Sequence, residues 1–290
     1  MPTVPKCAKN AHHVKVVANA VSVAVKAVVN AAIGASVAKP MHLPVTLFSV
    51  VDPGGDLPRA IAEEIELALA AARLEGVGAE HVTRSGHIAE SILAAAADAG
   101  ADLIVLPEMF STGFTMDSAT VAETMGGATV NWMLEQAQQR QKVLCGSLVI
   151  KEQGQFFNRM LWVQPNGEMQ IYDKGHLFRM AGEDEHYSEG TRRVVVDFQG
   201  WRICLSVCYD LRFPELYRAL GEVDLILVPS AFTYTTGRAH WETLLRARAI
   251  ENQCYVLAPA QGGTHENGRR TWGHSILIDP WGEVLSVLPE

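Results

Sequence analysis

The stretch "ADLIVLPE", residues 101–108, is a short apolar run that ends on a proline and a glutamate. A continuous run of this length is typical of a strand buried on both faces of a sheet. Upstream, "VTLFSVVD" (45–52) predicts another strand. Residues 57–76 and 85–100 predict two helices, because both segments are rich in helix formers and end at a glycine. The order strand, helix, helix, strand predicts an α/β fold.

Composition limits the class of protein and of partner. The chain has 290 residues, 48% of them hydrophobic, which is enough for a large α/β core. A net charge of −8 and the lack of a basic stripe argue against a nucleic-acid partner. An odd number of cysteines without a CxxC pair predicts reduced thiols in a cytoplasmic protein and no metal site. These cysteines are Cys7, Cys145, Cys204, Cys208 and Cys254.

The first 43 residues form a low-complexity segment rich in Ala, Val and Lys. Lys15, Lys26 and Lys39 interrupt the apolar windows, so we expect no membrane span. A signal peptide is the alternative interpretation, although Lys26 breaks its apolar part. We expect a weakly specified helix or strand that either packs on the core or frays. Removal of residues 1–40 should then be tolerated.

Residues 44–105 resemble the later part of a universal stress protein domain. The resemblance rests on "PVTLFSVVD" and "SGHIAESILAAAADAGADLIV". It implies an α/β segment, which we expect to pack into the sheet. In that family the last strand leads into a glycine-rich loop that binds phosphate. Here the chain continues as "LPEMFSTGFTMD", so ATP binding is not expected.

Residues 106–290 resemble the nitrilase superfamily of carbon–nitrogen hydrolases through three separated motifs. "LPEMFSTGF" contains Glu108, "YDKGHLF" contains Lys174, and "VCYDLRFPE" contains Cys208. The resemblance implies that these residues form a catalytic triad, with a second glutamate, Glu183, seven residues before Gly190. It also implies an α-β-β-α sandwich of four layers and no cofactor.

Two further expectations follow from the same resemblance. The family would add another strand and a tail that joins the partner subunit beyond "SVLPE", where this sequence stops. The hydrolase domain would then be truncated at its C-terminus. The resemblance is also compatible with a homodimer.

A cysteine, a glutamate and a lysine together can hydrolyse an amide. A thiol must lose its proton before it attacks a carbonyl carbon, and a buried carboxylate such as Glu108 can take that proton. The Lys174 ammonium and the backbone N–H of Tyr209 are candidates to stabilise the oxyanion. We also expect the ammonium to favour the Cys208 thiolate. Considered singly, each of these residues more often has a structural role.

Neighbouring residues receive structural interpretations. Cys204 falls on the same side of an extended strand as Cys208 but lacks the following "YD", so we expect it in the core. Asp210, Arg212 and Glu215 predict a buried ion-pair scaffold.

The expected substrate class is a small aliphatic amide. The middle of the chain is similar to omega-amidases and the later part to deaminated glutathione amidases, which implies a 2-oxoglutaramate-like substrate. Candidate pocket residues are Phe114, Phe178, Phe232 and Thr233, with core packing as the alternative. The alternative function is a stress-protein-like binding module fused to a catalytically impaired hydrolase scaffold.

Overall fold

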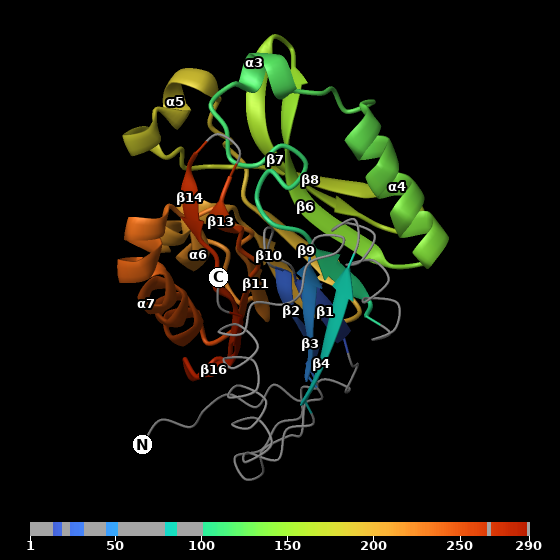
Figure 1. Ribbon diagram of the computed structural model, residues 1–290, viewed down its shortest axis with the longest axis vertical. Coiled ribbons are helices and arrows are strands. Elements are labelled where there is room, and N and C mark those ends of the chain that lie inside the picture. The colour runs from blue at the N-terminus through green and yellow to red at the C-terminus, as the bar shows by residue number, and fades with distance from the viewer. Residues whose placement is uncertain are drawn as a thin grey trace.

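The computed structural model describes the backbone of residues 14–18, 24–31, 45–51 and 79–85, and then residues 101–265 and 268–288. The two helices expected at 57–76 and 85–100 lie outside the described residues, apart from Ser85. Figure 1 shows two sheets packed together, with helices on their outer sides. In the described part of the chain, no helix combines the length and apolar character needed to cross a membrane.

The larger sheet has eight strands in the order β4-β3-β2-β1-β5-β6-β7-β8. Their bounds are β1 Val14–Ala18, β2 Ala24–Ala31, β3 Val45–Val51, β4 Ala79–Ser85, β5 Leu103–Val105, β6 Val143–Glu152, β7 Gln155–Val163 and β8 Met169–Asp173. The strand predicted within 101–108 is β5. It pairs in parallel with β1 on one side and β6 on the other. All three β5 residues are buried, as a strand covered on both faces must be.

The N-terminal segment supplies the neighbour of β5. Val16 to Ala18 of β1 pair with Leu103 to Val105, and β2 pairs antiparallel with β1. The sequence left open whether this segment forms a helix or a strand and whether it packs or frays. Residues 14–18 and 24–31 form strands that belong to the sheet. The strand predicted over 45–52 is present as β3, but β2 and β1 separate it from β5.

The second sheet has six strands in the order β16-β15-β12-β11-β10-β9. Their bounds are β9 Val194–Phe198, β10 Trp201–Leu205, β11 Leu225–Leu227, β12 Tyr255–Ala258, β15 Ser275–Ile278 and β16 Val284–Leu288, and a separate hairpin joins β13 Gly262–Thr264 to β14 Arg270–Trp272. The described helices are α3 Ser118–Val121, α4 Ala128–Arg140, α5 Glu183–His186, α6 Pro214–Arg218 and α7 Tyr234–Asn252, with short 3-10 helices η1 Arg179–Ala181 and η2 Cys208–Arg212.

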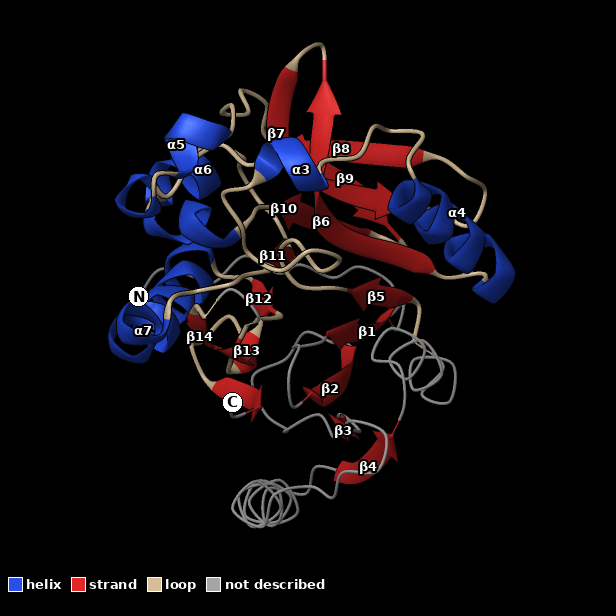
Figure 2. Ribbon diagram, turned by 45° about the horizontal axis from the view of Figure 1, so that its top comes forward, coloured by secondary structure: helices blue, strands red, loops and turns tan. Residues whose placement is uncertain are grey.

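Successive side chains of β5 point to opposite faces of the sheet and so contribute to two different cores. Leu103 and Val105 join the core between the two sheets, whereas Ile104 packs in the cluster beneath α4. On the far side, Trp241 and Leu245 of α7 cover the second sheet. In Figure 2, α4 and α7 lie on opposite outer sides of the sheets. The predicted four-layer α-β-β-α sandwich is confirmed.

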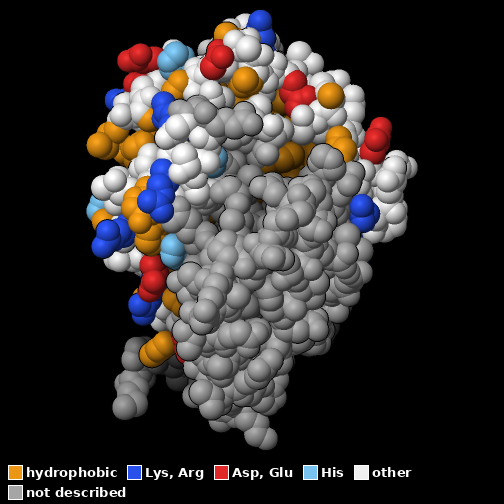
Figure 3. All heavy atoms as spheres, viewed as in Figure 1, with side chains coloured by type: hydrophobic (Ala, Val, Ile, Leu, Met, Phe, Trp, Pro, Cys, Tyr) orange, Lys and Arg blue, Asp and Glu red, His pale blue; other side chains and the backbone are white. Residues whose placement is uncertain are grey.

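The surface in view carries charges of both signs. Figure 3 shows acidic and basic side chains interspersed over the described part of this face. The coloured, described part of this face carries no continuous basic stripe of the kind that binds nucleic acid.

Candidate active site

Three catalytic candidates follow the carboxyl ends of three strands. Glu108 comes three residues after β5, and Lys174 immediately follows β8. Cys208 lies three residues after β10, as the first residue of η2. Ligand sites in α/β sheets gather at such strand ends. The structure brings together all four residues that the resemblance named: Glu108, Lys174, Cys208 and, from α5, Glu183.

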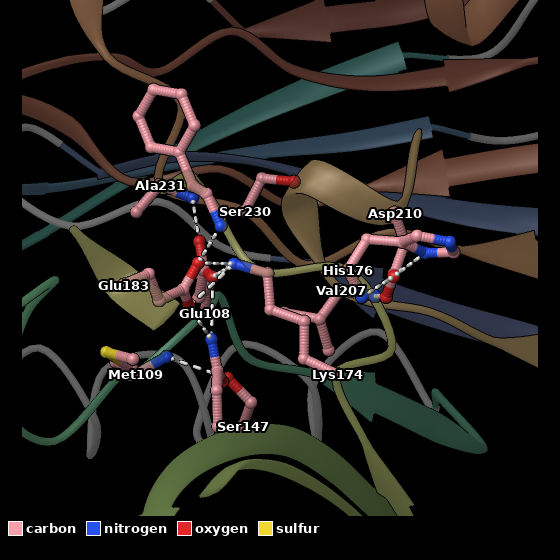
Figure 4. Close-up of polar contacts among 12 residues, drawn as sticks. Glu108, Met109, Ser147, Lys174, His176, Glu183, Val207, Asp210, Ser230 and Ala231 are labelled. Atoms are coloured by element: carbon pink, nitrogen blue, oxygen red, sulfur yellow. Dashed lines mark hydrogen bonds and ion pairs between the residues drawn. The ribbon is translucent and has the colours of Figure 1, made fainter. Parts of the chain in front are cut away.

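A buried charge cluster forms the centre of the site. The Lys174 ammonium lies 2.9 Å from Glu108 Oε1 and 2.9 Å from both carboxylate oxygens of Glu183. All three side chains are at most 1% exposed. Figure 4 shows the Lys174 amine pointing between the two carboxylates. Two negative charges around one positive charge leave this dry cluster with a net charge of −1 when all three groups are ionised.

Two polar groups that the sequence did not reveal complete the cluster. The Ala231 N–H donates to Glu108 Oε2 at 2.8 Å. The amide nitrogen of Asn158, on β7, donates to Glu108 Oε1 at 2.8 Å and to Glu183 Oε1 at 3.4 Å. An amide in the largely apolar stretch "FFNRMLWV", where Arg159 is the other polar residue, was the available signal for Asn158.

The loop that carries Glu183 is closed by the glycine singled out in the sequence. The Gly190 N–H donates to the Lys174 carbonyl at 2.9 Å. A Cβ atom at residue 190 would lie 2.1 Å from the Asp173 carbonyl oxygen. Only glycine permits this close approach, which returns the loop to the strand end that holds Lys174. At the other end, the Phe178 N–H donates to Glu183 Oε2 at 2.6 Å.

Cys208 occupies a strained backbone position. Its φ is +48°, a left-handed conformation that a residue with a Cβ rarely adopts. Its N–H donates to the Pro229 carbonyl at 3.0 Å. Tyr209 is the second residue of η2, so its N–H is among those without an acceptor inside the helix. Cys204 is fully buried in β10, which confirms its assignment to the core.

The environment of Cys208 favours the thiol. Burial is the main cause that raises the pKa of Cys208 well above its usual value, followed by the negative charge of Glu108. The Lys174 ammonium lowers the pKa of Cys208, but by less. The ammonium thus acts in the expected direction, towards the thiolate, but burial and Glu108 outweigh it. The hydrogen bond between the thiol and Glu108 also raises the thiol pKa.

Lys174 remains protonated. Burial alone lowers the pKa of this ammonium, but the charges of Glu108, Glu183 and Cys208 outweigh burial and raise the pKa well above its usual value. A cation is thus held permanently beside the sulfur.

Asp210 organises the turn that carries Cys208. It accepts hydrogen bonds from the Val207 N–H at 2.9 Å, the Tyr172 hydroxyl at 2.7 Å and the His176 N–H at 2.9 Å. Figure 4 shows Asp210 beside His176, on the side of Lys174 away from Glu108. These bonds join the end of β10, which precedes Cys208, to the end of β8, which precedes Lys174.

The predicted ion-pair scaffold is wrong. Arg212 lies over the rings of Tyr209 and Phe232 and contacts His240 Nδ1 at 3.2 Å. Glu215 is exposed. Asp210 satisfies its oxygens with a hydroxyl, backbone amides and a histidine, because the fold places those donors nearer than the guanidinium.

The predicted pocket residues divide into two groups. Phe114 packs beside Ala231, and its ring lies 5.8 Å from the Lys174 ammonium. The centroid of the Phe178 ring lies 5.1 Å from that of Tyr209, the residue that follows Cys208. Phe232 packs on Trp241 in the main core, and Thr233 precedes α7 with its hydroxyl on Thr236. Within the described residues, no group of three His, Cys, Asp or Glu side chains could hold a metal ion.

Known proteins resemble the chain in sequence and in structure. The model of the carbon–nitrogen hydrolase family matches residues 68–290. Omega-amidase YafV of Escherichia coli is 44% identical over 188 residues, which cover 65% of this chain and 73% of that protein. A deaminated glutathione amidase of Synechocystis is 38% identical over 234 residues, covering 74% and 86%.

A solved structure agrees with these relatives. A CN-hydrolase superfamily protein from Xanthomonas campestris, with an arsenic adduct in its active site, superposes with a TM-score of 0.64 at 38% identity. The match covers 68% of this chain and 78% of that one.

The comparisons correct the sequence analysis at one point. They give no support to the universal stress protein resemblance of residues 44–105, and the family match begins inside that segment, at residue 68. The alternative of a fused binding module loses its basis. The predicted enzyme class, a hydrolase of carbon–nitrogen bonds, is confirmed. The chain belongs to the carbon–nitrogen hydrolase family.

Proposed function

We propose that this protein releases ammonia from a small aliphatic amide of the 2-oxoglutaramate kind, through a thioester on Cys208. The observation that carries the proposal is the position of Glu108. Its carboxylate contacts both the Lys174 ammonium and the Cys208 thiol in a buried site. The proposed base thereby contacts both the cation and the nucleophile.

In the proposed first step, Glu108 takes the thiol proton while the sulfur attacks the amide carbon. The S–H bond breaks, an O–H bond forms on Glu108, and the carbonyl oxygen becomes an oxyanion. The Lys174 ammonium and the Tyr209 N–H stabilise that oxyanion. Collapse of the intermediate breaks the C–N bond, and the Glu108 proton leaves with ammonia.

In the second step, a water molecule gives a proton to Glu108 and attacks the thioester carbon. The C–S bond breaks, and the sulfur recovers the proton from Glu108. Glu183 keeps Lys174 in place, since both of its oxygens contact the ammonium. Each atom that enters leaves as ammonia or a carboxylic acid.

The substrate class rests on the names of the relatives and on charge. Arg212 places a cation over the rings of Tyr209 and Phe232, which adjoin the nucleophile and the Ala231 amide. A guanidinium at this position suits the carboxylate of an oxo-acid amide. A cytoplasmic location and a homodimer stay predictions.

The test is ammonia release from 2-oxoglutaramate by purified protein. We expect Cys208→Ala to abolish release, because no other side chain can replace the attacking sulfur. Cys204→Ala, a buried cysteine four residues away, is the matched control and should retain activity. In the native protein, mass spectrometry of a rapidly quenched reaction should detect the acyl group on Cys208. Equal loss in both variants, with both folded, would contradict the proposal.

A further inference from the structure

The lone pairs of the two buried glutamates are unequally occupied. A carboxylate offers about four acceptor positions, two on each oxygen. For Glu183, Oε1 accepts from Lys174 and Asn158, and Oε2 accepts from Lys174 and the Phe178 N–H. Every position on Glu183 is filled, so this glutamate is poorly placed to receive a proton.

Glu108 keeps one acceptor position for the Cys208 thiol, which hydrogen-bonds this carboxylate. Its Oε1 accepts from Lys174 at 2.9 Å and from Asn158 at 2.8 Å, and its Oε2 accepts from the Ala231 N–H at 2.8 Å. The same Ala231 amide also bonds the Cys208 sulfur. The remaining position of Oε2 therefore lies on the side of the thiol.

We propose that Asn158 is a positioning residue, which occupies the second acceptor position of Glu108 Oε1 and so directs the Cys208 proton to Oε2. This inference rests on the proposed function of Glu108 as the base. In the transfer, the S–H bond breaks and the Oε2–H bond forms, and the proton arrives facing the sulfur and the leaving ammonia. Without Asn158, Oε1 could take the proton on the side away from the reaction.

The other half of the Asn158 side chain supports this role. Its amide oxygen is buried and has no hydrogen-bond partner among the described residues. A buried acceptor without a partner destabilises the fold. The amide oxygen therefore does not explain why residue 158 is an asparagine, and the N–H donors must do so. The nitrogen must face the two carboxylates, because the reverse orientation would set three acceptors against one another.

The charged and titratable groups that face Glu108 define what a variant would change. They are Lys174 after β8, Glu183 from α5, Cys208 from η2, and Tyr187. The pKa of Tyr187 is raised by burial first, then by the charge of Glu183, and then by that of Glu108. Asn158 is the neutral donor in this set. Its removal should increase the proton affinity of the Glu108 carboxylate without changing the net charge.

The experiment compares Asn158→Leu and Asn158→Asp, which have nearly the same size as Asn and lack the N–H donor. We expect the acidic limb of the kcat/KM profile to move to higher pH in Asn158→Leu, and further in Asn158→Asp, which adds a negative charge. The kcat value should fall about tenfold with little change in KM, because orientation in the chemical step is lost and substrate contacts are not.

The matched control is Ser147→Ala. Ser147 is buried on the neighbouring strand β6 and accepts the N–H of Met109, beside the same glutamate, without touching its carboxylate. This variant should leave the acidic limb in place. An unchanged limb in folded Asn158→Leu, or an equal shift in Ser147→Ala, would overturn the proposal.

A second readout does not depend on turnover. In the Cys208→Ala background, ¹³C NMR of glutamate-labelled protein can follow protonation of Glu108 directly. We expect Asn158→Leu to move that titration to higher pH. If the protein with Cys208 intact released no ammonia, the proposed function would fail. A shift of the Glu108 titration would still support the role of Asn158. An unmoved titration would contradict the role of Asn158 in an active enzyme.

Discussion

Among single residues, Cys208 shows the strongest conflict between its environment and its proposed role. Burial and the charge of Glu108 both stabilise the neutral thiol, although a nucleophile must be a thiolate. A neutral thiol is compatible with this role because Glu108, the proposed base, contacts the sulfur. The thiol proton then needs to leave only while the sulfur attacks. A neutral resting sulfur is also less exposed to unwanted alkylation and oxidation.

This conflict predicts how iodoacetamide labels the protein. Because the native pKa of Cys208 is raised, its labelling rate should climb with pH through the alkaline range. Glu108→Gln removes the nearby negative charge, so the pKa of Cys208 should fall and the labelling profile should move to lower pH. Amide hydrolysis by the same variant should drop about 10²- to 10⁴-fold, because the base is gone.

Cys254 is the internal control in the labelling experiment. Burial raises the pKa of Cys254 to about 12, and Glu108 is not among the causes. Its labelling should be the same in both proteins when followed by peptide mass spectrometry. A Cys208 profile that stays in place or moves to higher pH in Glu108→Gln would show that Glu108 does not contact the sulfur.

Among the elements, the loop between β8 and β9 decides whether Glu183 reaches Lys174. It begins at Lys174 and returns at Gly190, whose N–H bonds the Lys174 carbonyl. The two ends of the loop are thus tied to one strand end. A displacement of residue 190 would move the loop relative to Lys174, and Glu183 with it.

We therefore predict that Gly190→Ala is damaging. The added Cβ would lie 2.1 Å from a backbone oxygen, which cannot move as a flexible side chain can. Such overpacking destabilises by about 1–3 kcal/mol. Urea unfolding should show that loss, and kcat should fall because Glu183 no longer holds the ammonium.

The matched control for Gly190→Ala is Gly126→Ala, which lies outside this loop, just before α4. At residue 126 the nearest atom to an added Cβ is the Thr124 hydroxyl, at 4.0 Å. We expect stability and kcat to stay close to native. If Gly190→Ala behaved like this control, the loop would not depend on the close approach at Gly190.

For the whole molecule, the position of β1 reverses an expectation drawn from composition. Residues 1–43 carry no chemistry of their own, which suggested that residues 1–40 could be removed. In the structure, however, β1 is hydrogen-bonded to β5, and Glu108 lies three residues after β5. The strand that carries the base is thus supported from the N-terminal segment.

Two truncations test this support. A chain that begins at Met41 lacks β1 and β2, so one side of β5 loses its partner and becomes an open edge prone to aggregation. We expect a lower melting temperature and less ammonia release. A chain that begins at Val14 keeps both strands and should match the native protein. Native stability and activity in the chain that begins at Met41 would show that the fold does not need β1.

The sequence by itself determined the class of fold and named the candidate reacting groups. The apolar run before Glu108 predicted a doubly covered strand, and the three motifs around Glu108, Lys174 and Cys208 predicted the triad. Such features are local, because a buried strand must be apolar and a motif is continuous in the chain.

Only the tertiary structure decided which groups surround those residues. Asn158 and the Ala231 amide lie 50 and 123 positions from Glu108, and no local pattern links them to it. The partners of Asp210, the high pKa of Cys208 and the place of β1 beside β5 have the same origin. Hydrogen-bond partners, burial and strand order depend on which distant segments pack together, and the free energy of that packing is a property of the whole core.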